Sequence, residues 1–242
     1  MFKDFNIKLK RFLRISQKFI KYNIRIVFGS RFVYFLLFAI LLFATIIFIS
    51  LVDNEIPNEV SLYYTLIIPA IAIILYPTSY CIQSDQDMKT LELLFGIPDY
   101  RYKTWLIRLL LVFVVAFFII LFLSFISHIL ITDVRFFKMA FHIMFPTIFS
   151  GCVAFWLATV LKNGTGAAVV LVILILIFFF LQDFFEETSW YLYLNPFHDS
   201  GSMSKEAWRQ IVLRNRLYLG GLSIIFLLFG LFNLQKREGF LK

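Results

Sequence analysis

Side chains that could carry out catalysis are few in this sequence and lie far apart. The three histidines are His128, His142 and His198, and the two cysteines, Cys81 and Cys152, occupy apolar positions. Metal sites need such ligands in close clusters, and phosphate-binding loops need a glycine-rich turn followed by a lysine. The sequence contains neither pattern. We therefore predict no catalytic residue, no metal site and no cofactor bound directly by this chain.

Charged residues are also missing from the centres of the long apolar runs. Proton- or ion-coupled transporters place carboxylates there, so this absence argues against that class and against an intramembrane metalloprotease. His142 falls within one run, where it is either functional or a neutral packing residue, and both interpretations stay open. The polar residues inside the runs are small and suit close helix packing. They are Thr45, Ser50, Ser124, Thr147, Ser150, Gly151 and Thr159.

The apolar runs themselves predict the architecture. Of the 242 residues, 61% are hydrophobic and 16% are charged, whereas a soluble domain has roughly a quarter of its residues charged. We predict an all-α polytopic membrane protein with one transmembrane domain, residues 1–242. Pro69 and Pro77 predict a kinked or broken second span. The six predicted spans, each near the roughly 20 residues that cross a bilayer, are residues 32–52, 61–82, 105–126, 139–161, 165–181 and 217–234.

The distribution of Lys and Arg between the connections predicts the orientation. With the N-terminus inside, 17 of these residues lie on the cytoplasmic side and six on the outer side. Cytoplasmic loops carry the excess of positive charge in membrane proteins. We therefore expect both termini in the cytoplasm and the chain in the cell inner (cytoplasmic) membrane.

The first 30 residues are basic and amphipathic. At about 100° per residue, one helical stripe gathers five basic side chains and the opposite face is apolar. This pattern predicts a helix lying in the membrane interface, against lipid headgroups. The alternative is an unstructured arm that only enforces topology, and a nucleic-acid partner is not expected. The stripe consists of Lys10, Arg14, Lys18, Lys21 and Arg25.

Residues 182–216 form the longest predicted outer connection. Asn195-Pro196 and Gly201 mark turns, and Ser204 resembles a helix start. We expect short outer helices here, in an extracytoplasmic segment rich in aromatic residues. The segment is either a helical lid over a pathway or an ordinary set of interfacial anchors.

Residues 83–103 form a half-polar connection between the second and third spans. Leu91, Leu94 and Phe95 follow the i, i+3, i+4 spacing of one helical face, and acidic residues surround them. This pattern indicates helical character.

The stretch "DQDMKTLELLFGIPDYRYKTWLIRLL" resembles the permease subunits of ATP-binding-cassette transporters of the type-2 exporter family. Members carry an acidic stretch after the second span, then Thr-Leu-Glu with leucines, and a proline and basic residue before the third span. Arg108 stands where members have a basic residue at the mouth of that span. Lys89 and Asp99-Tyr100 depart from the pattern. The matching residues are Asp85, Asp87, Thr90, Leu91, Glu92, Leu93, Leu94, Pro98 and Arg101.

The resemblance implies a partner and a mechanism. In such transporters the cytoplasmic coupling helix, here residues 83–103, docks on a separate nucleotide-binding ATPase subunit. The resemblance implies that Leu91, Leu94 and Phe95 form its apolar docking ridge, and the alternative is a solvated amphipathic loop. Two copies of that subunit would hold ATP and Mg, so this chain itself would not be an enzyme. Dimerisation with itself or with a second permease is implied as well. The residues expected to dock are Asp85, Asp87, Thr90, Leu91, Glu92, Leu94, Phe95, Pro98 and Arg101.

Three function classes follow from the sequence. The first is an exporter permease, for which the aromatic, uncharged interior favours an amphiphilic or lipidic substrate. The second is a polytopic scaffold or immunity-type protein that sequesters a partner. The third, a membrane-embedded enzyme, lacks any acid, base or metal set in the apolar runs.

Overall fold

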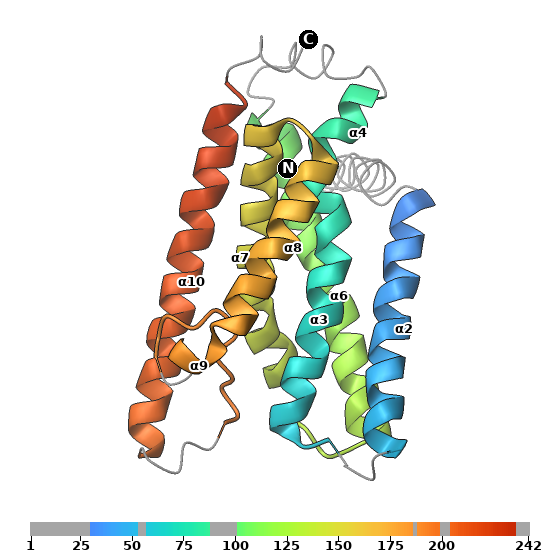
Figure 1. Ribbon diagram of the computed structural model, residues 1–242, viewed down its shortest axis with the longest axis vertical. Coiled ribbons are helices and arrows are strands. Elements are labelled where there is room, and N and C mark those ends of the chain that lie inside the picture. Colours follow the sequence, from blue (N-terminus) through green and yellow to red (C-terminus); the bar gives the residue numbers. More distant parts are fainter. Residues whose placement is uncertain (1–29, 53–56, 88–100, 186–187, 199–203, 236–242) are drawn as a thin grey trace, which may run out of the picture.

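The computed structural model describes residues 30–52, 57–87, 101–185, 188–198 and 204–235, which form helices joined by short loops (Figure 1). Within these ranges no residue is in a β-strand. The π-helix η1 runs directly into α6. The elements are α2 (Ser30–Val52), α3 (Glu59–Ser79), α4 (Cys81–Asp87), η1 (Arg101–Leu106), α6 (Ile107–Leu130), α7 (Phe136–Leu161), α8 (Gly164–Phe180), α9 (Gln182–Phe185) and α10 (Lys205–Asn233).

Most of these helices have the length and composition of membrane spans. Five helical stretches are long and apolar enough to cross a membrane: α2, α3 with α4, the end of η1 with α6, α7, and α10. The sixth helix, α8, is apolar and has 17 residues, which is near the lower limit for a span. The prediction of an all-helical protein is confirmed, and the helices fit a multi-pass membrane protein.

The outward faces of most helices are largely apolar, as are their buried faces. On α6, Phe118 and Phe122 are 62% and 61% exposed, while Ile120 and Leu123 on the other side are buried. A helix that is hydrophobic all round belongs in a large core or in a membrane. The exposed phenylalanines of α6 therefore suit contact with lipid tails.

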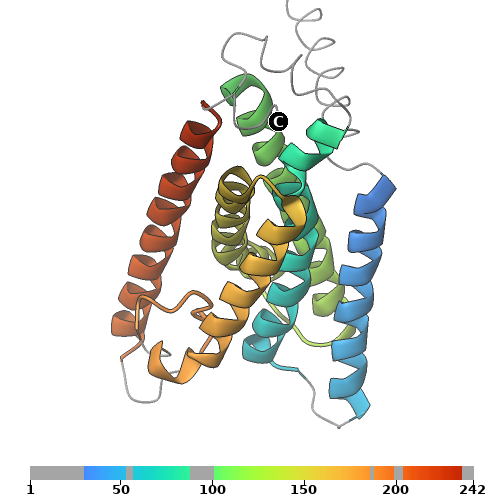
Figure 2. The same cartoon turned by 45° about the horizontal axis from the view of Figure 1, so that its top comes forward.

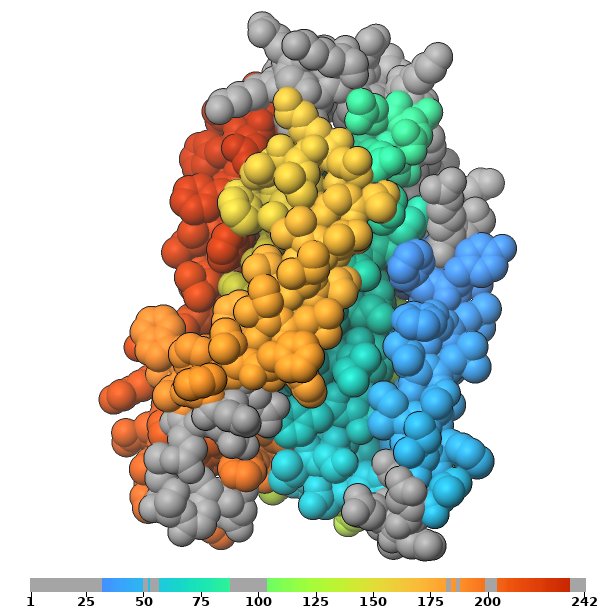
Figure 3. Space-filling view, in the orientation of Figure 1, coloured from blue at the N-terminus to red at the C-terminus, as the bar shows by residue number. Residues whose placement is uncertain are grey.

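The helices run up and down between two ends of one bundle (Figure 1). We call them the α4 end, where α2 begins and α10 stops, and the α9 end, where α6 connects to α7. The central helix is α7, which packs against α3, α6, α8 and α10 (Figure 2). In the space-filling view α8 crosses the bundle obliquely and α2 lies at its edge (Figure 3).

Close approach to α7 depends on small residues. A Cβ on Gly151 would lie 2.6 Å from Cε1 of Phe113 in α6, and a Cβ on Gly230 would lie 2.7 Å from the ring of Phe155. Ser150 is buried and its hydroxyl donates to the carbonyl of Pro146 at 2.8 Å. On α7 the predicted small polar residues Thr147, Ser150 and Thr159 are buried, with hydroxyls satisfied inside their own helix. The buried Ser124 hydroxyl of α6 has no hydrogen-bond partner among the described residues.

The helix of the second span continues through both of its prolines. The α3 helix passes through Pro69 and Pro77 and ends at Ser79, after which the chain bends at Tyr80 into α4. The predicted break therefore lies three residues beyond Pro77. It leaves α4 as a separate short helix at the α4 end.

The last span begins earlier than predicted. We expected a separate outer helix near Ser204 and a span over residues 217–234, but α10 is one continuous helix from Lys205 to Asn233. Ser204 is its N-cap and accepts a hydrogen bond from the Ala207 backbone N–H at 3.2 Å. Residues 205–216 of the predicted extracytoplasmic segment therefore belong to the bundle.

Candidate functional site

The predicted coupling helix is described only at its flanks. Asp85 and Asp87 lie in α4, and Arg101 is the first residue of η1. The other expected docking residues lie outside the described residues, as does the predicted interfacial helix. These are Thr90, Leu91, Glu92, Leu94, Phe95 and Pro98 in the first group, and Lys10, Arg14, Lys18, Lys21 and Arg25 in the second.

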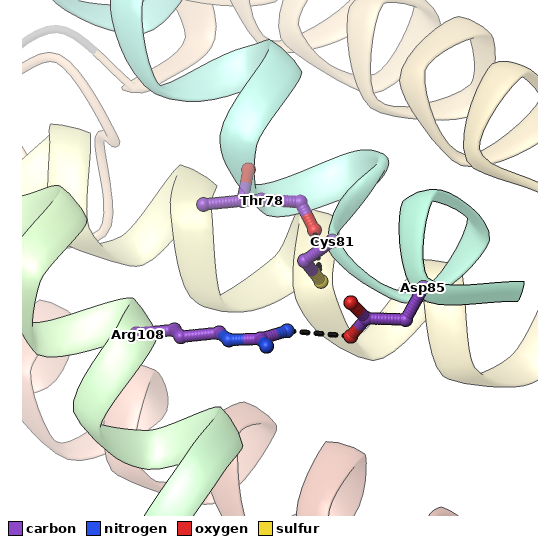
Figure 4. Close-up of polar contacts among 4 residues, drawn as sticks. All are labelled: Thr78, Cys81, Asp85 and Arg108. Atoms are coloured by element: carbon purple, nitrogen blue, oxygen red, sulfur yellow. Dashed lines mark hydrogen bonds and ion pairs between the residues drawn. The ribbon is translucent and has the colours of Figure 1, made fainter. Parts of the chain in front are cut away.

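An ion pair joins the two flanks of this segment. Nη1 of Arg108, at the start of α6, lies 2.5 Å from Oδ2 of Asp85 in α4 (Figure 4). Both side chains are buried, with Asp85 1% and Arg108 5% exposed. Since the two residues are 23 positions apart, the pair closes the connection that contains the predicted docking residues.

Asp85 and Asp87 differ in their burial. The resemblance implies that both, with Glu92, offer charge complementarity to a docked subunit, which stays a prediction. In the structure the Asp85 carboxylate points to Arg108 inside the bundle (Figure 4). Asp87 is exposed. Within the acidic stretch, Asp85 thus faces the bundle interior and Asp87 faces outward.

Aromatic and sulfur-containing side chains surround the pair. The Arg108 guanidinium carbon lies 5.2 Å from the ring centroid of Trp105, which is 1% exposed. Cys81 lies beside the pair and donates its thiol to the carbonyl of Thr78 at 3.1 Å (Figure 4). Arg108 therefore has a charged partner and a π face at once, which fixes the direction of its side chain.

The start of α8 is tied to the same place. Oε1 of Gln83 accepts the backbone N–H of Gly164 at 2.7 Å, and the hydroxyls of Tyr80 and Thr165 are 3.0 Å apart. A Cβ on Gly164 would lie 2.9 Å from Oε1 of Gln83 and 3.0 Å from the Ser79 carbonyl oxygen. Glycine is therefore required for this close approach.

We call Tyr80, Gln83, Asp85, Arg108 and Gly164 the polar junction. Removing one partner of a buried ion pair typically costs about 3–5 kcal/mol, because the remaining charge loses its compensation in a medium of low polarity. The hydrogen bonds to α8 are short-range and directional. The polar junction therefore holds α4, α6 and α8 in fixed positions relative to one another, beside the ends of the predicted docking segment.

A second polar network lies toward the α9 end and centres on Arg216. The distribution of Lys and Arg places Arg216 in the outer connection. In the structure it lies two residues after Arg214 on α10 and is only 5% exposed. Its Nη2 donates to the Tyr63 hydroxyl at 3.0 Å and to the Leu194 carbonyl at 2.9 Å, and its Nη1 donates to Oδ1 of Asn215 at 2.9 Å. The bundle interior thus contains charges that the apolar runs did not predict.

His142 belongs to this second network. Its Nδ1 is 3.5 Å from Nε of Arg216, and its ring meets that of Phe197 edge-on, with centroids 6.0 Å apart. The imidazole is partly buried. His142 therefore lies beside a buried cation, and the contacts are those of a packed residue next to a polar site.

The outer connection packs into the α9 end of the bundle. Residues 188–198 form turns, not a helical lid, and Tyr191 and Leu194 are buried. The side-chain amide of Asn215 donates to the Tyr191 carbonyl at 2.7 Å, and that of Asn195 donates to the Val60 carbonyl at 2.9 Å. Burial raises the pKa of the Tyr193 phenol in this segment. The exposed Trp190 keeps the surface position expected of an interfacial anchor.

Within the described ranges, no three His, Cys, Asp or Glu side chains group closely enough to hold a metal ion. Comparisons with family models, with curated proteins and with solved structures give no match for this chain. The resemblance to exporter permeases therefore depends on the residues between the second and third spans and remains a prediction.

Proposed function

We propose that the chain is the transmembrane permease subunit of an ATP-binding-cassette exporter. It would move an amphiphilic or lipidic substrate out of the cytoplasm or inner leaflet, driven by ATP hydrolysis in a separate nucleotide-binding subunit. The observation that carries the proposal is the polar junction. It connects both flanks of the segment that resembles the coupling helix directly to the bundle.

This geometry suits the transmission of force from a docked subunit. A partner that presses on residues 88–100 acts on α4 and on η1 at the same time, because the chain enters from one and leaves through the other. The ion pair between Asp85 and Arg108 makes those two flanks move together. The hydrogen bond from Gly164 to Gln83 extends the motion to α8.

The distribution of buried charge favours an external energy source. Among the described residues the buried charged side chains are Asp85, Arg108 and Arg216, and no carboxylate is buried among the middle turns of α2, α6, α7, α8 or α10. Ion-coupled transporters depend on such carboxylates near the bilayer midplane. ATP and Mg would reside in the partner subunit, present in two copies around a permease homodimer or heterodimer.

Affinity purification tests the partner. We expect a nucleotide-binding subunit to co-purify with the tagged full-length chain from native membranes after mild cross-linking. The double variant Glu92→Ala/Leu94→Ala should reduce its recovery at least tenfold, because it removes a docking charge and the centre of the apolar ridge. Glu206→Gln, an exposed acidic residue at the other end of the bundle, is the matched control and should leave recovery unchanged.

Two results would overturn the proposal. One is purification of the intact chain without any ATP-binding subunit, which would favour a scaffold or immunity-type protein. The other is equal recovery of the ATPase with wild-type chain and the double variant, which would remove the docking assignment.

A further inference from the structure

A cavity of about 1020 Å³ lies between α7 and α10 toward the α9 end. Its wall also includes Glu59 at the start of α3 and Phe197 in the outer connection. The volume is large enough for a small amphiphile. Neither the polar junction nor the proposed docking segment contributes to it, so the cavity needs its own explanation.

Positive charge dominates the polar part of this cavity. Five basic side chains line it, against a single acidic one, Glu59. The basic residues come from the first turns of both helices and from one position deeper along α10. They are Arg135, Lys138, Lys205, Arg209 and Arg216.

The deepest of these cations has only neutral partners. Arg216 is 5% exposed, and every hydrogen bond that it makes goes to a hydroxyl, an amide oxygen, a carbonyl or the His142 imidazole. No described carboxylate forms an ion pair with it. A guanidinium has five N–H donors in a fixed plane, of which these bonds use four. One N–H and the whole positive charge therefore remain for an anion.

A second donor in the wall is also unsatisfied. Trp208 lines the cavity and is 8% exposed, and its indole N–H has no hydrogen-bond acceptor among the described residues. Buried polar groups in native proteins normally have a partner. Trp208 lies two turns before Arg216 on α10. Eight residues rise about 12 Å along a helix, and the Trp208 N–H is itself buried, so Arg216 is the donor that we assign to a ligand.

Much of the remaining wall is apolar and reaches the surface of the bundle. Phe141, Leu213 and Leu217 line the cavity and are 49%, 60% and 67% exposed. Such side chains suit an acyl chain, whereas the cations beside them suit a phosphate or carboxylate. We propose that this cavity binds an anionic amphiphile, with Arg216 holding its acidic group and Phe141, Leu213 and Leu217 contacting its tail. The proposal goes beyond the proposed function and does not require the ATPase partner.

Binding of lysophospholipids to the full-length chain tests this site. The protein is kept in a neutral maltoside detergent and titrated with lysophosphatidylglycerol, with lysophosphatidylcholine of the same chain length, or with inorganic phosphate, and binding is measured by native mass spectrometry. We expect the anionic lysolipid to bind at least tenfold more tightly than the zwitterionic one. Inorganic phosphate should bind more weakly than either, because it lacks the tail.

Variants locate the site on the cavity. Arg216→Gln should weaken lysophosphatidylglycerol binding about tenfold to a hundredfold, the usual range for a charge-assisted hydrogen bond. Because Arg216 also contacts three other elements, the exposed pair Arg135→Gln/Lys138→Gln provides an independent variant that leaves the interior intact and should weaken binding severalfold. Arg214→Gln removes the same charge from an exposed position on α10 outside the cavity wall and should change nothing.

Three outcomes would overturn the proposal. Equal affinity for the two lysolipids would mean that the cavity recognises only the tail. Phosphate binding as tight as lysolipid binding would mean that the site takes a free anion. Unchanged affinity in both the Arg216 variant and the double variant would place any lysolipid binding elsewhere on the chain.

Discussion

At the scale of single residues, the most informative contact is the one between Asp85 and Arg108. Both charges are removed from solvent, and each belongs to a different flank of the predicted docking segment. Ion pairs in such surroundings are seldom needed for stability alone, since apolar residues of similar size often serve as well. The pair is therefore better explained as a device that fixes α4 to α6.

This explanation predicts an asymmetric response to substitution. Asp85→Leu or Arg108→Met should lower the free energy of unfolding by about 3–5 kcal/mol, because each removes one partner of a buried pair. The apolar double variant Asp85→Leu/Arg108→Met should lose much less than the sum of the two single losses. Unfolding of the purified chain in mixed micelles of SDS and a mild detergent measures these differences.

Asp87→Ala is the matched control, because Asp87 lies in the same helix but is exposed. It should have little effect on unfolding. Losses that are equal for Asp85 and Asp87, or that add fully in the double variant, would contradict a buried coupling between Asp85 and Arg108.

At the scale of elements, Gly164 determines how closely α8 approaches α4. The first residue of α8 donates its backbone N–H to Gln83 and passes beside the carbonyl of Ser79. Asn163 caps the helix by accepting the Gly166 N–H at 2.9 Å. The preceding residue, Lys162, has a positive φ of 54°, which turns the chain sharply between α7 and α8.

Gly164→Ala should displace the start of α8 and destabilise the chain by about 1–3 kcal/mol, the usual cost of overpacking. The matched control is Gly166→Ala two residues later, where a Cβ would lie 3.7 Å or more from its neighbours. That substitution should be neutral or slightly stabilising, because alanine favours a helix. Thermal unfolding of both variants in detergent measures the difference, and equal effects would contradict the close approach.

The sequence predicts the helices better than it predicts their contacts. The lengths of the apolar runs predict the six apolar helices. Ser204 predicts a helix start, which is the start of α10. The continuity of α10 was missed, because residues 205–216 are polar and the burial of Asn215 and Arg216 depends on the outer connection packing against them. The pair between Asp85 and Arg108 was missed for a similar reason. Nothing in the intervening residues indicates that the two positions meet across the bundle.

At the scale of the whole molecule, the bundle has two chemically different ends. The α4 end carries the polar junction, and the α9 end carries the packed outer connection and the basic cavity. From the excess of Lys and Arg in the predicted inner loops, we predict that the α4 end faces the cytoplasm. This orientation would place the predicted docking segment where ATP is available.

Cysteine labelling tests this orientation. In a chain with Cys81→Ser and Cys152→Ala, a membrane-impermeant maleimide should label Asp133→Cys in intact cells but should label Asp87→Cys only after the cells are opened. Asp133 lies in the α6–α7 connection and Asp87 at the end of α4, and both are exposed. Labelling of Asp87→Cys alone in intact cells would invert the bundle and remove the docking segment from the cytoplasm.

The most direct test of the proposed function is site-specific photo-cross-linking in native membranes. A photoreactive phenylalanine analogue is placed at Leu94, in the apolar ridge of the docking segment, or at the exposed Trp190 at the other end of the bundle. We predict a covalent adduct with a nucleotide-binding ATPase from position 94 and none from position 190. No ATPase adduct from position 94, with the chain intact in the membrane, would contradict the proposal that this protein is driven by ATP hydrolysis in a docked subunit.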